Sequence, residues 1–172
     1  MAVASLRRRI ARLATSLGPP NGLIQPSPNP AGAASATLSS ISCTAEDDCM
    51  AVGSYSSNGV DERTLERRKW TRQPSPSPAG ANTSALNGVS CLSSLACTAV
   101  GGWSASSQDN PAFTLAEQWN GTAWAVESTP NPAGAQRSTL LGVDCLPEGA
   151  CAAAGDFSNG SVTQTLIERY SP

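Results

Sequence analysis

Six cysteines divide into three pairs that share one spacing and one set of neighbours. In each pair five residues separate the cysteines, a leucine stands five positions before the first, and a glycine stands four positions after the second. The pairs are Cys43/Cys49, Cys91/Cys97 and Cys145/Cys151, and an aromatic residue follows each pair, at Tyr55, Trp103 and Phe157. Self-similarity at a nearly fixed period is the signature of a repeat architecture, so we expect three copies of one structural unit.

A second marker, Pro-Ala-Gly, recurs with the same offsets as the cysteines. The two markers place the units at about 28–74, 76–129 and 130–172, within a β domain that covers 23–172. Only 14% of the residues are charged, and the many Gly, Pro, Ser and Thr residues favour short strands and turns over long helices.

We expect four antiparallel strands in each unit, with the fourth absent from the third unit. The first strands are predicted at 38–43, 86–91 and 140–145, the second at 49–55, 97–103 and 151–157, the third at 64–67, 114–119 and 165–170, and the fourth at 70–73 and 124–128. Asn120-Gly121 lies between Trp119 and Trp124. Because Asn and Gly tolerate positive φ, a tight type I′ hairpin is predicted there.

Proline-rich stretches such as SPSPAGANTS and TPNPAGAQRS join the units. Proline cannot donate to a strand ladder, so these stretches are predicted to be extended connectors. Such crossovers join the outer strand of one β-propeller blade to the inner strand of the next, and propellers carry about 4–8 blades. The predicted fold class is therefore all-β, a propeller-like array of three four-stranded units that forms a partial ring or half-ring. The alternative is a β-trefoil, which also has three four-stranded repeats.

The cysteines of each pair end one predicted strand and begin the next, so they face each other across a hairpin at ~4.5–5.5 Å between Cβ atoms. We expect three disulfides; free buried thiols are one alternative, and a zinc site, which the spacing and the absence of histidine disfavour, is another. Disulfides predict an extracellular or cell-surface location. No signal peptide is visible, because Arg12 interrupts the apolar stretch, so this N-terminus is doubtful as the native one.

The chain contains no histidine, which excludes Ser-His-Asp and Cys-His catalysis, and we expect no cofactor. Apart from an arginine-rich leader at 1–22, expected to be disordered or a short helix, acidic residues outnumber basic ones, so no nucleic-acid partner is expected. No stretch approaches ~20 apolar residues, so we expect no membrane span.

The string L-x-x-V-x-C-x5-C-x-A-V-G-x-W begins at Leu86, and T-L-x-E-x-W-N-G-x-x-W and P-N-P-A-G-A follow it. It resembles repeats of secreted actinobacterial proteins of unknown function, over about residues 24–172. More distantly it is similar to kelch and Asp-box β-propeller blades. The resemblance implies a propeller-like fold and names no activity.

Three residues are candidates for facing a ligand. Asp144 and Asp156 depart from the Ser or Gly of the other units, and Trp103 is one of the recurring aromatics; surface variation and packing are the alternatives. The recurring Glu66, Glu117 and Glu168 are expected to be structural, and the acidic loop 46–48 to be a solvated tip rather than a calcium site.

The predicted function is a non-enzymatic extracellular repeat module that binds a carbohydrate or a protein surface. One alternative is a fragment of a propeller-type glycosidase or lyase whose active site lies in missing repeats; another is a structural spacer of a larger surface protein. Leu23, Ile24 and Gln25 match the end of a fourth strand. A homodimer in which this segment completes the third unit of a second chain is therefore also predicted.

Overall fold

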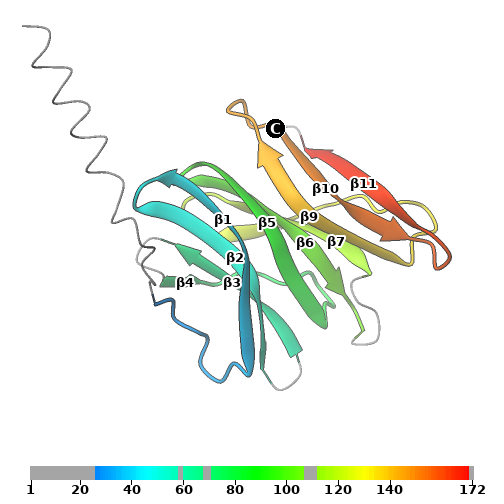
Figure 1. Ribbon diagram of the computed structural model, residues 1–172, viewed down its shortest axis with the longest axis horizontal. Coiled ribbons are helices and arrows are strands. Elements are labelled where there is room, and N and C mark those ends of the chain that lie inside the picture. The colour runs from blue at the N-terminus through cyan, green and yellow to red at the C-terminus, as the bar shows by residue number, and fades with distance from the viewer. Residues whose placement is uncertain (1–25, 58–59, 68–70, 107–111, 171–172) are drawn as a thin grey trace, which may run out of the picture.

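The computed structural model describes residues 26–57, 60–67, 71–106 and 112–170, of which 60–67 and Thr71 are described by their backbone alone. These residues are all-β, contain no helix and form three antiparallel sheets, as the sequence predicts for the fold class (Figure 1). The first sheet, in the order β1-β2-β3-β4, comprises β1 (Ser35–Ala45), β2 (Asp48–Ser57), β3 (Val60–Arg67) and β4 (Thr71–Gln73). The second, β5-β6-β7-β8, comprises β5 (Thr83–Ser93), β6 (Ala96–Ser104), β7 (Phe113–Trp119) and β8 (Trp124–Glu127). The third, β11-β10-β9, comprises β9 (Arg137–Cys145), β10 (Cys151–Ser158) and β11 (Thr163–Tyr170).

The first two strands of each sheet share one register, in which the paired cysteines stand directly opposite each other. Farther along, a β-bulge interrupts the ladder next to a leucine, and a glycine lies opposite that leucine. A Cβ on Gly53, Gly101 or Gly155 would lie 1.9 Å from a carbonyl oxygen of the facing strand. The glycine of each motif is therefore required because the bulge presses one backbone against the other.

Several strands are longer than predicted. β1 begins at Ser35 rather than at Leu38, and β11 begins at Thr163 rather than at Thr165. The ladder continues even into the connectors, where Gln136 N–H donates to the Ser158 carbonyl at 2.8 Å. The hydrophobic pattern stops where polar residues begin, but backbone hydrogen bonding between the strands continues through those polar residues. A prediction from the hydrophobic pattern alone therefore makes the strands too short.

Two of the second strands begin one residue before the cysteine that was predicted to start them. β2 starts at Asp48 rather than at Cys49, because Asp48 pairs with Ala45 across the hairpin, one step beyond the disulfide. β6 shows the same extension and starts at Ala96 rather than at Cys97, whereas β10 begins at its cysteine as predicted. In the first two sheets, the register shifts just beyond the cysteine pair, and the strands then continue to pair toward the hairpin tip. The cysteine spacing does not reveal this shift.

Each Pro-Ala-Gly marker forms a turn. Ala33, Ala81 and Ala135 donate their N–H groups to the carbonyls of the prolines three positions earlier, at 3.0–3.1 Å. The intervening Gly80 has a φ of 81°, and its two counterparts adopt similar values. Positive φ at the third position is the hallmark of a type II turn, so the turn gives the glycine of each marker a conformational reason.

The Asn-Gly hairpin differs from the prediction by one position. Asn120 N–H donates to the Ala123 carbonyl at 3.2 Å, so the two central residues are Gly121 and Thr122, with φ at 94° for the glycine. The Asn120 side-chain oxygen accepts the N–H groups of Thr122 and Ala123, both at 3.0 Å. Asparagine therefore closes this turn as an Asx motif instead of occupying its centre.

The hydrophobic core lies between the sheets, which stack in chain order with β5 beside both β1 and β9 (Figure 1). Between the first and second sheets, the buried cluster contains Met50, Val52, Leu86, Val89, Ala99 and Leu115. Between the second and third sheets, it contains Val100, Ala116, Leu140 and Ala153. The second sheet is thus buried on both faces, whereas these clusters cover one face of each outer sheet.

Candidate interaction surface

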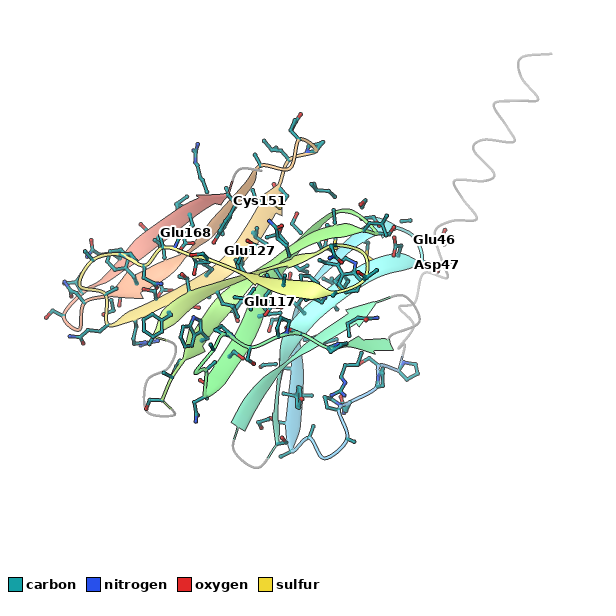
Figure 2. The ribbon with its side chains drawn as sticks, turned by 180° about the vertical axis from the view of Figure 1, so that it is seen from behind. Glu46, Asp47, Glu117, Glu127, Cys151 and Glu168 are labelled. Atoms are coloured by element: carbon teal, nitrogen blue, oxygen red, sulfur yellow. A yellow bond between two sulfur atoms is a disulfide. The ribbon has the colours of Figure 1, made fainter. Side chains whose placement is uncertain are left out.

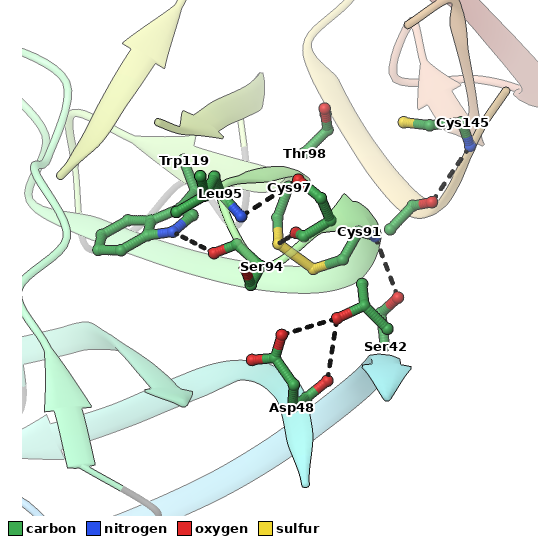
Figure 3. Close-up of a disulfide and its surroundings, with 12 residues drawn as sticks. Ser42, Asp48, Cys91, Ser94, Leu95, Cys97, Thr98, Trp119 and Cys145 are labelled. Carbon is green, nitrogen blue, oxygen red and sulfur yellow. Dashed lines mark hydrogen bonds between the residues drawn. A yellow bond between two sulfur atoms is a disulfide. The ribbon is translucent and has the colours of Figure 1, made fainter. Parts of the chain in front are cut away.

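All three cysteine pairs form disulfides, with Cα atoms 3.9–4.0 Å apart and no free cysteine among the described residues. The bridges are Cys43–Cys49, Cys91–Cys97 and Cys145–Cys151, as predicted. The alternatives of free thiols and a zinc site are therefore wrong. Figure 3 shows the Cys91–Cys97 bridge beside Trp119, whose indole N–H donates to the Ser94 carbonyl at 3.3 Å. Because disulfides persist only under oxidising conditions, the bridges indicate an oxidising, extracellular setting.

Asp144 and Asp156 lie on the same face of the third sheet but do not meet. Asp144 on β9 stands opposite Ala152 of β10, and Asp156 follows four positions later on β10. At about 3.3 Å per residue, the two positions are on the order of 13 Å apart. Among the described residues, no three His, Cys, Asp or Glu side chains are grouped to hold a metal ion. The two acids therefore do not form one site, and a ligand for either remains a prediction.

Trp103 is half-buried and packs against the cluster between the first and second sheets. Its ring stacks on Phe113, with centroids 4.7 Å apart and planes inclined by 29°. Phe113 is 39% exposed, so the pair presents an open ring at the end of β6 and β7 opposite the disulfide. Trp103 therefore combines the packing role with an accessible aromatic neighbour that the sequence motif does not include.

The two recurring glutamates whose side chains are described are buried. Glu117 is 0% exposed and accepts a 2.6 Å hydrogen bond from the hydroxyl of Ser75, which lies in the connector between the first two sheets. Glu168 accepts a 2.6 Å hydrogen bond from the Tyr170 hydroxyl. Burial, this hydrogen bond and the negative charge of Glu168 raise the pKa of Tyr170 well above its usual range. These contacts support the structural role that recurrence suggests.

Neither Ser75 nor Tyr170 stands out in the sequence. The Tyr170 contact has a sequence signal, because residues two apart on a strand point to the same face. Ser75 has no such signal, since its partner is 42 residues away in the chain.

The acidic loop at 46–48 is tied to its own hairpin. The Thr44 hydroxyl donates to a carboxylate oxygen of Asp48 at 2.8 Å, which Figure 3 also shows. Glu46 and Asp47 lie at the hairpin tip, far from the buried Glu168 (Figure 2). The loop therefore presents its charge at one end of the first sheet.

The outer face of the third sheet is exposed and partly apolar. We define it by Leu141, Ala152, Ala154 and Ile167, with Asp144, Asp156 and Arg169 around them. Ile167 is 64% and Leu141 55% exposed, and both alanines are exposed. The equivalent positions in the second sheet are occupied by Val100 and Ala116, which pair directly with each other. There, Val100 and Ala116 are buried against the third sheet.

The outer face of the first sheet is partly exposed, although Ala51, which lies on it opposite Ile41, is only 1% exposed. It carries Leu38 and Ile41, which are 44% and 55% exposed. The corresponding Leu86 and Val89 of the second sheet are 0% and 7% exposed, because the first sheet covers them. A shallow cavity of about 90 Å³ lies beside Leu38, between β1 and the connector at 27–30.

Hydrogen bonds between β1, β5 and β9, the first strands of the three sheets, connect successive sheets. Cys91 N–H donates to the Ser42 hydroxyl oxygen at 3.0 Å, and Cys145 N–H donates to that of Ser90 at 3.2 Å (Figure 3). Asp144 holds the same place in the third sheet and is exposed. β5 and β9 also approach closely, since a Cβ on Gly88 would lie 2.8 Å from the Cα atom of Gly142.

No protein-family model matches the chain, and no curated protein shows significant similarity to it. Within the described ranges, no helix is long and apolar enough to span a membrane. The leader at 1–22 and the segment Leu23, Ile24 and Gln25 lie outside the described residues.

Proposed function

We propose that the three sheets are successive blades of a propeller-like repeat array, and that the chain is an extracellular, non-catalytic module that binds a protein surface. The stacking of the sheets in chain order supports the array, because each connector runs from the outermost strand of one sheet to the innermost strand of the next. Every described strand pairs only within its own sheet, which disfavours a β-trefoil, where strands of different repeats pair in one barrel.

The observation that carries the binding function is the outer face of the third sheet. The end units of repeat arrays need a polar outer face for solubility. Here Ile167 is 64% exposed at a place where the second sheet buries Ala116 to 1%. An apolar patch surrounded by polar residues such as Asp144 and Arg169 is typical of a protein-binding surface.

Site-specific photo-crosslinking tests this function. A photoreactive amino acid replaces Thr165, which lies on the outer face opposite Asp156, and the matched control carries it at Ser161, in the exposed β10–β11 turn. We expect a protein adduct in the medium of producing cells at 165 and not at 161, and its loss when Ile167→Asp is added. No adduct at 165 would refute protein binding, and hydrolysis of a sugar panel by the purified chain would refute the non-catalytic assignment.

A carbohydrate ligand is the second candidate, and the Trp103–Phe113 stack favours it. An aromatic ring that is 39% exposed and held by a second ring offers a preformed platform for a sugar face. A glycan array distinguishes the candidates. Binding that Phe113→Ala abolishes and Val162→Ala preserves would support the sugar site; an array without any signal would refute it.

A further inference from the structure

We infer that the outer face of the third sheet docks on the outer face of the first sheet of a second copy of this chain, head to tail. The inference rests on the proposed function and names the partner. Two copies bring six sheets together, within the range of about 4–8 blades that propellers use. Each chain carries both halves of the contact, and two identical contacts close a ring when the rotation between the two copies is a half-turn.

The two outer faces complement each other because the chain already makes this contact twice. At the contact between the second and third sheets, Val100 and Ala116 pack against Leu140. At the outer face the matching pair is Ala154 and Ile167, in which the large and small side chains exchange places. Both pairs therefore contain one large and one small aliphatic side chain. In the contact between copies, Leu38 of the second copy takes the place that Leu140 has within the chain.

Gly142 provides an independent observation. It corresponds to Gly88, which must be glycine because the neighbouring sheet comes within 2.8 Å of its would-be Cβ. Nothing lies within 4 Å of a Cβ built on Gly142, and its φ is not positive. Nothing described in the chain itself therefore requires glycine here. A glycine inside a strand often marks the close approach of another backbone, which the second copy would supply through Ser40.

Asp144 supplies the polar contact. Ser42 and Ser90 each accept the N–H of the first cysteine of the next sheet. In the head-to-tail contact, the Asp144 carboxylate accepts the N–H of Cys43 in the second copy. A charged acceptor makes a stronger hydrogen bond than a hydroxyl oxygen does. The alternative contact, between two third sheets, matches no contact within the chain.

The mass of the full-length, oxidised chain in solution tests the inference, measured by light scattering over a range of concentrations. We expect a dimer for the wild-type chain. Ile41→Glu and Ile167→Lys change opposite halves of the contact, and each is expected to raise Kd at least about tenfold, because each buries an unpaired charge. Gly142→Ala is expected to raise the Kd of the dimer without loss of folding, since no described atom of the chain lies within 4 Å of a Cβ built at this position. Asp144→Ser restores the residue of the other units and should preserve the dimer.

Mixing distinguishes the head-to-tail contact from other arrangements. In a mixed dimer of Ile41→Glu with Ile167→Lys, one contact pairs Glu with Lys and the other contact is wild-type. An equimolar mixture should therefore regain the dimer that each variant lacks. Circular dichroism and urea unfolding establish that each variant is folded before its mass is interpreted.

Three results would overturn the inference. These are a monomeric wild-type chain at high micromolar concentration, a folded Ile41→Glu variant that stays dimeric, and a mixture that stays monomeric. If the chain is monomeric but residue 165 still crosslinks to a different protein, the head-to-tail contact fails while the proposed function stands. If no adduct forms at all, both fail.

Discussion

Each sheet has a leucine at the equivalent position, but the exposed fraction of its side chain differs greatly between the sheets. The effect of Leu→Ala on the free energy of unfolding can therefore be compared at three equivalent sites. Leu86 and Leu140 are 0% exposed, and Leu38 is 44% exposed. Leu→Ala at a fully buried site removes the transfer free energy of the lost carbons and leaves a cavity, at a cost of about 3–4 kcal/mol. At Leu38 only about half of the transfer free energy is at stake and no closed cavity forms, so the expected cost is about 1 kcal/mol.

Urea unfolding measures these costs, with tryptophan fluorescence as the probe and at a concentration where the chain is monomeric. Trp119 and Trp124 lie in the same buried cluster as Leu86, so their emission reports the packing that this substitution disturbs. We expect Leu86→Ala and Leu140→Ala to lower the free energy of unfolding by at least about 2 kcal/mol more than Leu38→Ala does. Equal losses at Leu38 and Leu86 in the monomer would refute the reasoning, because they would mean that the outer face of the first sheet is already covered.

Three further predictions concern other parts of the fold. Gly101→Ala should cost about 3 kcal/mol, because its Cβ would meet a backbone carbonyl, whereas Gly142→Ala should change the monomer's stability by under about 1 kcal/mol; urea unfolding compares the two. Replacing Cys91 and Cys97 together by serine should lower the free energy of unfolding by about 2 kcal/mol, the loop-closure entropy of so small a loop, and an unchanged unfolding midpoint would contradict this. The raised pKa of Tyr170 keeps its phenol protonated in the fold while an unfolded tyrosine ionises near pH 10, so stability should fall as pH rises above about 10. The fall should be less steep in Tyr170→Phe, as thermal unfolding between pH 8 and 11 would show, and identical slopes would rule out this role for the phenol.

The cysteine motif makes much of the fold predictable, because it determines the register of each first hairpin. Once Cys91 faces Cys97, strand alternation places Val89 on the same face as Cys91, and Val89 is buried. Leu86 reaches this face only through the bulge between Leu86 and Gly88, which the spacing does not predict. The all-β class and the three disulfides follow from the same pattern. The strand ends are less predictable, because the ladder through Ser35 depends on backbone hydrogen bonds that no hydrophobic periodicity reveals.

The details that sequence reasoning missed depend on contacts between segments far apart in the chain. The hydroxyl of Ser75 meets Glu117 only because the connector folds back over the second sheet. The hairpin at Asn120 shifts by one position because its side chain satisfies two backbone N–H groups, a local choice that a dipeptide rule does not distinguish from an Asn-Gly centre. The apolar outer face was missed for another reason: sequence comparison among the units identifies what recurs, and Ile167 does not recur.

The residues that recur in all three units therefore say little about function. The cysteines, the bulge glycines and the buried glutamates each have a structural reason that holds for every sheet. Functional information must lie where the units differ at equivalent places. Within the described residues, notable differences are Asn87 to Leu141, Ser90 to Asp144 and Ala116 to Ile167, and each of them belongs to the outer face of the third sheet. Two of the three changes add apolar surface and one adds charge, at a face that no other described sheet covers. This is the pattern expected where a partner takes the place of a further sheet.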